Sequence, residues 1–310
     1  MLEPQISAII CTHNRDNYLG AAIDSLLEQD FTEFEVVVVD NASSDRTREV
    51  VEARLSNPRL RYVWEPVLGL SVARNTGAEL SRGQILAYLD DDAIASPGWL
   101  RVIYSAYQNQ ENLAIAGGKV TLLWPDDLTR PKWLSPTLAG NLGAYDLGDK
   151  IVHITDPNLT PRGLNYSILR KFWAEIGGFD RHLGRIGKKL LSNEELYTTE
   201  KALAQGWQVV YLPDALVFHH IAIERLQPSW FFRRSWWQGI SECYREQLGD
   251  RAGLCQLYQG WERCCRGLYK ACKYFTDPGM RFENLVYAYG QIGYLGAAIQ
   301  GMLLSRKQID

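Results

Sequence analysis

The sequence predicts an α/β fold, in which a mixed, mostly parallel β-sheet is flanked by helices and followed by a helical C-terminal extension. Short uninterrupted apolar runs, rich in β-branched residues, recur between residues 6 and 92. Segments whose apolar residues have helical spacing separate these runs, and such strand–helix alternation is typical of βαβ units. From Pro228 the composition changes to Trp, Phe and Arg on a helical background.

The first third of the chain supplies four predicted strands. The first two are continuous apolar runs, which suit strands that are buried on both faces of a parallel sheet. The runs are ISAIIC at 6–11, FEVVVVD at 34–40, RLRYVWE at 59–65 and QILAYLDDD at 84–92. Helices are predicted between them, at 18–29, 45–55 and 71–83. Right-handed crossovers are the expected connections.

Beyond residue 93 the alternation weakens. Residues 118–163 are rich in Pro, Trp, Gly and Asp, with short strands predicted at GKVTLLW and KIVHIT. Long loops inside a domain tend to be functional. A helix near 193–205 and one or two strands at 207–220 complete the predicted α/β domain, which we expect to span residues 1–225. A helical region is expected at 226–310.

The charge distribution and the cysteine pattern bear on the binding partners and the cellular location of the protein. The net charge of −3 gives no reason to expect nucleic acid as a partner, yet residues 225–310 hold 12 Lys and Arg against 7 Asp and Glu. Such a basic segment suits anionic partners, including lipid head groups, although an uneven solvated surface is the alternative. The N-terminus lacks a signal-peptide pattern, and the six cysteines form no CxxC pair or zinc spacing. We expect a cytoplasmic protein, with peripheral association at the inner face of the membrane through the C-terminal region.

The stretch 284–305 contains no charged residue and is long enough to cross a bilayer, which needs about 20 apolar residues. It also contains Asn284, Gln291, Gln300 and four glycines, which make it polar for a membrane span. A helix packed on the protein, a helix lying at a membrane interface and a spanning helix all remain open at this point.

The strongest chemical signal is the triplet Asp90-Asp91-Asp92 at the end of the fourth predicted strand. Three adjacent carboxylates repel one another unless a cation or a solvated turn compensates, and hard oxygen ligands suit Mg²⁺ or Mn²⁺. Asp40 ends the second strand, and Thr12-His13-Asn14-Arg15 ends the first. Because the carboxyl ends of parallel strands meet at one edge of a sheet, where ligands bind, these groups predict a common site.

The motifs taken together resemble those of the family-2 glycosyltransferases, which have the GT-A fold. The resemblance runs from about residue 5 to 220, in the family's order; each motif is weak alone, and the set is specific. The matching segments are ISAIICTHNR, VVVVDNASSDRT, GLSVARNTG, the DDD triplet, GGFD at 177–180, NEELYTTEKALAQGW at 193–207 and LPDALVFH at 212–219.

The resemblance implies an inverting transferase that moves a sugar from a nucleotide-diphosphate donor, by default a UDP-sugar, to a hydroxyl of a saccharide or lipid-linked saccharide in polysaccharide or glycoconjugate synthesis. Mn²⁺ or Mg²⁺ would be the cofactor. Asp40 would accept a hydrogen bond from the pyrimidine base. The implied nucleotide-binding residues are Thr12, Asn14, Arg15, Asp40, Arg74, Asp90 and Asp91. The implied metal ligands are Asp92, Asp90 and His219, although a strand-end histidine can equally be a bystander.

The resemblance places the catalytic base at Glu194-Glu195. The family element usually reads Glu-Asp, and its second acid deprotonates the acceptor. Gly206 lies at the family-like distance downstream, which makes Glu195 the candidate and Glu194 the fallback. Glu in place of Asp moves the carboxylate by roughly one methylene, which matters where geometry decides rate. Alternatively, both acids only favour the N-terminus of a helix.

Two other functions compete with glycosyl transfer. A metal-dependent nucleotidyltransferase also uses strand-end carboxylates, but the chain has no Gly- and Lys-rich phosphate loop, no GxGxxG and no Walker A sequence. A catalytically silent nucleotide-sugar-binding module stays open because of the Glu-for-Asp replacement. We expect acceptor recognition in residues 118–166 together with the C-terminal helices.

Overall fold

The computed structural model describes residues 3–125, 128–248 and 254–307, with side chains up to Leu303. It divides into two compact units. The α/β unit comprises Met1–Leu123, Gly143–Gly184 and Glu194–His220, and the helical unit comprises Trp124–Leu142, Arg185–Asn193 and Ile221–Asp310. The domain boundary near residue 225 stays a prediction, and residues 249–253 and 308–310 of the predicted helical region lie outside the described residues.

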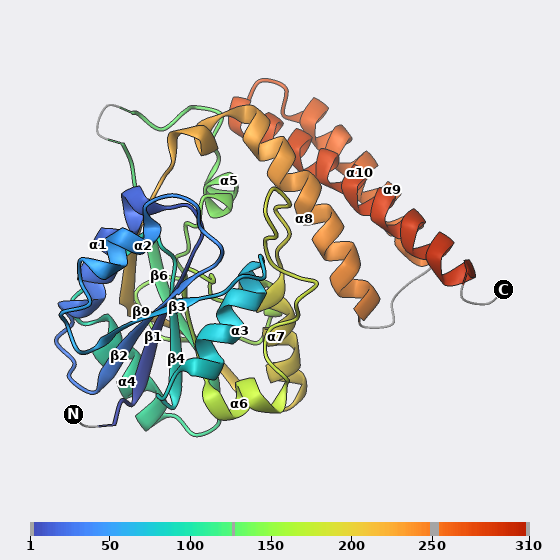
Figure 1. The fold of residues 1–310 in the computed structure, drawn as a ribbon. Coiled ribbons are helices and arrows are strands. Elements are labelled where there is room, and N and C mark those ends of the chain that lie inside the picture. The colour runs from blue at the N-terminus through green and yellow to red at the C-terminus, as the bar shows by residue number, and fades with distance from the viewer. Residues whose placement is uncertain (1–2, 126–127, 249–253, 308–310) are drawn as a thin grey trace. The chain divides into compact units, whose positions relative to one another are not determined.

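The α/β unit is built on one mixed sheet with helices on both faces (Figure 1). The strand order is β3-β2-β1-β4-β8-β6-β9-β5, and β7 pairs with β9. The strands are β1 Ile6–Thr12, β2 Phe34–Asp40, β3 Leu60–Trp64, β4 Ile85–Leu89, β5 Ala93–Ala95, β6 Leu113–Leu123, β7 Val152–His153, β8 Asn165–Leu169 and β9 Gln208–His220. The helices are α1 Asp16–Leu27, α2 Thr47–Glu52, α3 Leu70–Leu80, α4 Trp99–Asn109, α6 Arg170–Glu175 and α7 Glu194–Ala204, with a 3₁₀ turn at Pro157–Leu159.

The four predicted strands of the first third form a parallel array, β3-β2-β1-β4. Every residue of β2 is buried, as its continuous apolar run predicts. Helix α3 packs closely on this array at Gly77, where an added Cβ would stand 2.6 Å from a methyl carbon of Ile9. The register sets Thr12 beside Asp40, so the carboxyl ends of β1 and β2 are level. The predicted fold class is therefore confirmed for this half of the sheet.

The second half of the sheet differs from a simple parallel continuation. Strand β8 runs antiparallel between β4 and β6, and the segment 207–220 forms one long strand, β9. The buried Asn165 side chain holds this region together, because it accepts from Trp99 Nε1 at 2.8 Å and donates to the carbonyls of Lys119 and Ala215. Helix α4 and strand β8 were not predicted, and β6 begins before the predicted 118–124.

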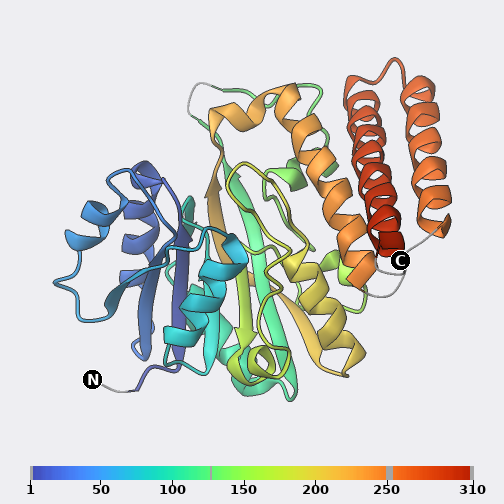
Figure 2. The same cartoon turned by 45° about the vertical axis from the view of Figure 1, so that its right-hand side comes forward.

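The helical unit contains α5 Pro136–Asn141, a 3₁₀ turn at Ile223–Leu226, α8 Pro228–Leu248, α9 Leu254–Lys273 and α10 Pro278–Lys307. Helix α10 lies between α8 and α9 (Figure 2). Glycines allow backbone contact between α8 and α10, since an added Cβ at Gly239 would stand 1.9 Å from the carbonyl oxygen of Gly290. Trp133, Phe231 and Phe282 pack edge to face in this unit, which is a core contact.

The uncharged stretch 284–305 lies within α10. Val286, Ala288, Tyr294, Ala297 and Ala298 of this helix are buried against its neighbours, so the packed-helix alternative describes its inner face. Along the described part of the chain, no helix combines the length and the apolar character needed to cross a membrane.

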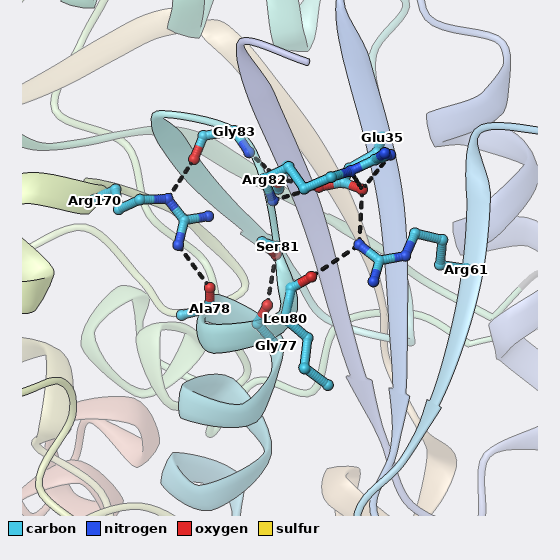
Figure 3. A network of polar contacts seen from close by, with 10 residues as sticks. Glu35, Arg61, Gly77, Ala78, Leu80, Ser81, Arg82, Gly83 and Arg170 are labelled. Carbon is cyan, nitrogen blue, oxygen red and sulfur yellow. Dashed lines mark hydrogen bonds and ion pairs between the residues drawn. The ribbon is translucent and has the colours of Figure 1, made fainter. Parts of the chain in front are cut away.

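A network of hydrogen bonds surrounds the buried carboxylate of Glu35 near the amino ends of β1 and β2 (Figure 3). Glu35 is only 1% exposed and accepts hydrogen bonds from Ser7 Oγ, from Arg61 Nη1 and from both the backbone and Nε of Arg82. Burial alone would raise the pKa of Glu35, but these hydrogen bonds outweigh it and lower the pKa. Arg170 extends the network by donating to the carbonyls of Gly83 and Ala78.

We predict that Glu35→Gln lowers the free energy of unfolding at neutral pH by about 2 kcal/mol, because hydrogen bonds from charged donors to a buried carboxylate are lost. Since the folded pKa is lowered, the stabilisation is fully present above the ordinary carboxyl pKa of 4.5 and is lost as pH falls through the folded value. Urea denaturation across an acid series measures both effects. The exposed Glu28→Gln is the control; equal stability and equal acid sensitivity of the two variants would contradict the prediction.

Candidate active site

The carboxyl ends of the central strands carry the polar groups that the sequence singles out. Thr12 and Asp40 end β1 and β2 side by side, and the aspartate triplet follows β4. Strand β9 delivers His219 to the same place, because Ala93 pairs with His219 and the His220 amide donates to the Asp92 carbonyl. The α/β unit therefore brings together the predicted metal ligands from two distant parts of the chain.

Asp90, Asp92 and His219 each offer a ligand atom, and these atoms all lie within 4.8 Å of one another. His219 Nε2 stands 3.0 Å from Asp92 Oδ1. Two ligands at right angles on a small divalent ion stand about 3 Å apart, so this spacing fits Mg²⁺ or Mn²⁺, as does the donor set of carboxylate oxygens and an imidazole. The roles of these three residues as metal ligands stay predictions.

The His219 ring is held from its other side by a glycine. Its Nδ1 is buried and has no hydrogen-bond partner among the described residues. Gly143, at φ +102°, lies so close that an added Cβ would stand 3.0 Å from this nitrogen. A left-handed backbone and the absence of a side chain are both needed there.

The electrostatics of the triplet favour a bound cation. Burial raises the pKa of the Asp91 carboxyl to about 7, the charge of Asp92 adds to the rise, and Arg15 and Thr12 oppose it. Arg15 Nη2 lies 3.8 Å from Asp92 Oδ2. One partly exposed guanidinium therefore faces several crowded carboxylates, and an ion beside them would relieve the repulsion.

The predicted nucleotide side is a pair of interlocked loops after β1 and β2. Both oxygens of the buried Asp40 are engaged, one by the Ser43 amide at 3.0 Å and one by Tyr62 OH at 2.8 Å. Burial and then Asp40 raise the pKa of Tyr62 to about 12, so its phenol stays protonated and donates. Asn14 Oδ1 accepts from the Ser44 amide, which fixes one loop to the other. The predicted nucleotide contacts of Asp40 and Asn14 stay predictions.

Arg74 lies in a different environment from the one that a nucleotide contact suggests. Its side chain is 4% exposed, and Nη1 donates to Glu194 Oε1 at 3.1 Å and to Glu195 Oε1 at 2.8 Å. Burial alone would lower the pKa of Arg74, but Glu195, Glu194 and Asp90 together raise it. The predicted base is thus bound by a buried guanidinium that also interacts electrostatically with Asp90 of the triplet. The expected role of Arg74 in nucleotide binding stays a prediction.

Glu194 and Glu195 are the first residues of helix α7, and their side chains differ in solvent exposure. The Glu194 side chain is 4% exposed, whereas that of Glu195 is 16% exposed. The loop before β8 packs directly on this pair, since a Cβ added at Gly163 would stand 1.8 Å from Glu195 Oε1 and 2.3 Å from Arg74 Nη2. Any side chain at 163 would displace the predicted base, a constraint that the sequence alone does not reveal.

Arg162, which directly precedes Gly163, is a candidate substrate-binding residue that the sequence analysis did not single out. Its guanidinium lies 5.3 Å from the centre of the Tyr145 ring, and its Nε has no hydrogen-bond partner among the described residues. Within that same part of the chain no carboxylate oxygen lies within ion-pair distance of it. Burial lowers the pKa of Arg162, and Glu195 is close enough to oppose this. The only sequence signal is its place in the loop-rich segment 118–166.

Comparison with known proteins identifies the family of the chain. The model of glycosyl transferase family 2 matches residues 7–169, more than half of the chain. A glucosyl-dolichyl phosphate glucuronosyltransferase from Haloferax volcanii is 29% identical over 253 residues, which cover 80% of this chain and 79% of that protein.

Two solved structures resemble the chain in fold. The mannosyltransferase PcManGT from Pyrobaculum calidifontis, in complex with GDP-Man and Mn²⁺, gives a TM-score of 0.59 at 19% identity and covers 100% of this chain and 81% of that one. TarS 1–349 from S. aureus, in complex with UDP, gives 0.53 at 16% identity and covers 96% and 91%. The GT-A fold predicted from the motifs is confirmed. Together with the family match, this architecture establishes that the chain belongs to glycosyl transferase family 2.

Proposed function

We propose that this glycosyltransferase moves a sugar from a UDP-sugar to a hydroxyl of a lipid-linked saccharide, with inversion and with Mn²⁺ or Mg²⁺ as cofactor. The observation that carries the proposal is the position of Arg74. Its buried guanidinium binds Glu195 and is close enough to Asp90 for the two charges to interact, so the predicted base and a predicted metal ligand both lie near one side chain. A base near the acceptor and a cation near the leaving group are what a single displacement requires.

Each group has a distinct task in this mechanism. Glu195 Oε accepts the proton of the acceptor hydroxyl, while Arg74 and Glu194 orient it. Asp90, Asp92 and His219 would hold the cation, which when bound supplies Lewis-acid stabilisation of the leaving diphosphate. Attack on the anomeric carbon from the side opposite the diphosphate inverts its configuration.

The acceptor class is supported by the family relationship. The Haloferax protein, which aligns over four fifths of this chain, is named for transfer of glucuronosyl to glucosyl-dolichyl phosphate, a lipid-linked saccharide. A UDP-sugar is the default donor that the motif resemblance implies, and a GDP- or dTDP-sugar is a separate outcome of a donor screen. Thermal shift with a panel of nucleotide sugars, with and without Mn²⁺, identifies the donor.

We predict that Asp92→Ala lowers turnover by roughly a thousandfold or more, because several kcal/mol of transition-state charge stabilisation depend on the bound cation. Calorimetric titration with Mn²⁺ in the presence of UDP should lose its binding signal in the same variant. Glu111→Gln, an exposed acid before β6, is the control and should behave as wild type. Normal metal-dependent activity of Asp92→Ala would show that the metal assignment is wrong.

We predict that Glu195→Gln lowers kcat roughly 10²- to 10⁴-fold, the contribution of a positioned general base. Its affinity for UDP and Mn²⁺ should not change, since the amide keeps the size of the acid. The kcat of Glu194→Gln should fall by less, because Glu194 is the more buried acid and acts through Arg74. A wild-type chain that binds donor without transferring it would instead favour a silent binding module, and a larger loss at Glu194 would reverse the assignment.

We further propose that Arg162 binds an anionic group of the substrate, because no carboxylate of the described residues lies within ion-pair distance of its partly buried charge. Arg162→Ala should weaken substrate binding roughly 10- to 100-fold, the equivalent of a charge-assisted hydrogen bond. The Kd for UDP and the KM for the acceptor separate a diphosphate contact from an acceptor-phosphate contact. Arg181→Ala, at an exposed site, is the matched control. If neither constant changes in Arg162→Ala, the residue has no binding role.

A further inference from the structure

Helix α8 presents three polar side chains to the segment of chain that leads into α7. Arg234, Gln238 and Ser241 are separated by four and three positions, so they lie on one face of the helix. This face binds residues 190–193, which belong to the same helical unit as α8. The hydrogen bonds that join them connect positions 42 to 49 residues apart in the sequence, so tertiary structure brings the two together.

Gln238 binds two consecutive residues of this segment with the two ends of its amide. Its Oε1 accepts from Ser192 Oγ at 2.8 Å, and its Nε2 donates to Asn193 Oδ1 at 2.9 Å. The backbone amide of Ser192 donates to Ser241 Oγ at 3.0 Å, and Ser241 is completely buried. Ser192 is therefore bound to α8 by both its main chain and its side chain.

Arg234 holds the start of the same segment. Its Nη1 donates to the carbonyl of Leu190 and to Ser192 Oγ, each at 3.3 Å. The backbone carbonyl of residue 190, the amide of residue 192 and the side chains of residues 192 and 193 thus all have partners on α8. A segment without helix or strand structure is fixed here by the side chains of one helix.

The backbone at the end of this segment needs such support. Asn193 has a φ of +80°, which lies in the left-handed region that residues with a side chain rarely adopt. Asparagine tolerates this region better than most residues, and here its side chain also supplies the acceptor for Gln238 Nε2. The residue is buried. The hydrogen bond from Gln238 therefore stabilises a turn that is unfavourable by itself.

The segment ends at the predicted catalytic base. Glu194 follows Asn193 directly as the first residue of α7, and Glu195 comes next. The backbone angles of Asn193 set the direction in which the chain enters α7, and with it the place from which the Glu195 side chain projects. A general base must lie within hydrogen-bond reach of the proton it removes, and a misplacement of about 1 Å can cost roughly a hundredfold in rate.

We propose that Gln238, supported by Ser241 and Arg234, is a positioning residue for Glu195. Its hydrogen bonds fix Ser192 and Asn193, and through them the backbone that carries the base. This inference rests on the proposed function, because it requires Glu195 to be the base. It gives α8 a part in the reaction, although the family motifs end near residue 220 and the family match covers only residues 7–169.

Gln238→Glu is the most direct test. It keeps the size of the side chain and replaces the donor Nε2 with an oxygen that faces Asn193 Oδ1. The kcat for transfer should fall roughly tenfold or more, because the base is displaced, whereas the Kd for UDP with Mn²⁺ should not change. Gln227→Glu, at an exposed position just before α8, introduces the same charge and is the matched control, with both constants expected to equal those of wild type.

A double-mutant cycle with Glu195→Gln separates positioning from general damage to the fold. When the carboxylate of the base is already absent, Gln238→Glu should cause no further fall in kcat, because it acts only through Glu195. A variant that merely destabilised the protein would lower kcat by the same factor in both backgrounds.

Asn193→Gly is a second variant that tests the same hydrogen bond from its other side. Glycine adopts a φ of +80° without strain, so the change removes only the side chain that Gln238 binds. It should lower kcat without changing the Kd for UDP. Gln238→Glu added to Asn193→Gly should cost less than it costs in wild type, since part of the interaction is already lost.

Two results would overturn the inference: wild-type kcat in Gln238→Glu, or an equal fall in kcat with and without the Glu195 carboxylate. If Glu195→Gln itself kept wild-type kcat, the proposed function would fail and this inference with it. A large loss of kcat in Glu195→Gln together with unchanged kcat in Gln238→Glu and Asn193→Gly would instead reject this inference alone.

Discussion

The buried guanidinium of Arg74 joins parts of the α/β unit that lie far apart in the sequence. It projects from α3 and meets the two acids that open α7. A lone arginine at this depth would lose its hydration without compensation, and removing one partner from a buried ion pair typically costs several kcal/mol. Two carboxylates and the rings of Tyr88 and Phe179 surround the charge instead. Because α3 packs on β1 and β2 through Gly77, the position of Glu195 is tied to the sheet that carries the aspartate triplet.

This arrangement leaves two unequal charge environments in one site. Arg74 has carboxylate partners, whereas the triplet crowds three carboxylates together, and burial, with the charge of Asp92 added, raises the pKa of Asp91. Among the described residues, Arg162 has no carboxylate within ion-pair distance, and the charge of Glu195 acts on it from farther away. In the proposed function, Asp90, Asp92 and His219 would hold the cation and Arg162 would bind an anionic group of the substrate. The proposed binding of a metal ion and an anionic substrate group rests on these opposite charges.

The sequence reveals the part of this site that depends on local pattern. Buried parallel strands are continuous apolar runs, so their ends at Thr12, Asp40 and Asp90 can be read directly, and the sheet must bring them together. The position of β8 cannot be read in the same way, because it depends on hydrogen bonds from Asn165 to two segments that are distant in sequence. Arg162 is likewise defined by what surrounds it in space. Motif resemblance supplies His219 and Glu195, which periodicity alone would not single out.

In the helical unit, hydropathy along the sequence likewise does not show which face of a helix is buried. A stretch without charges, 284–305, indicates only that its side chains are of low polarity. In the structure one side of it packs on neighbouring helices, with close contact at Gly239 and Gly290, while Ile292 and Leu303 on the other side are exposed. Helix α9 carries four cations, so its composition alone does not indicate an apolar surface. Its apolar surface becomes visible only when the inner face is known to be filled by Gly260, Gly267 and other small residues. Which medium a helix faces therefore depends on the side that its partners leave uncovered, and not on its mean hydropathy.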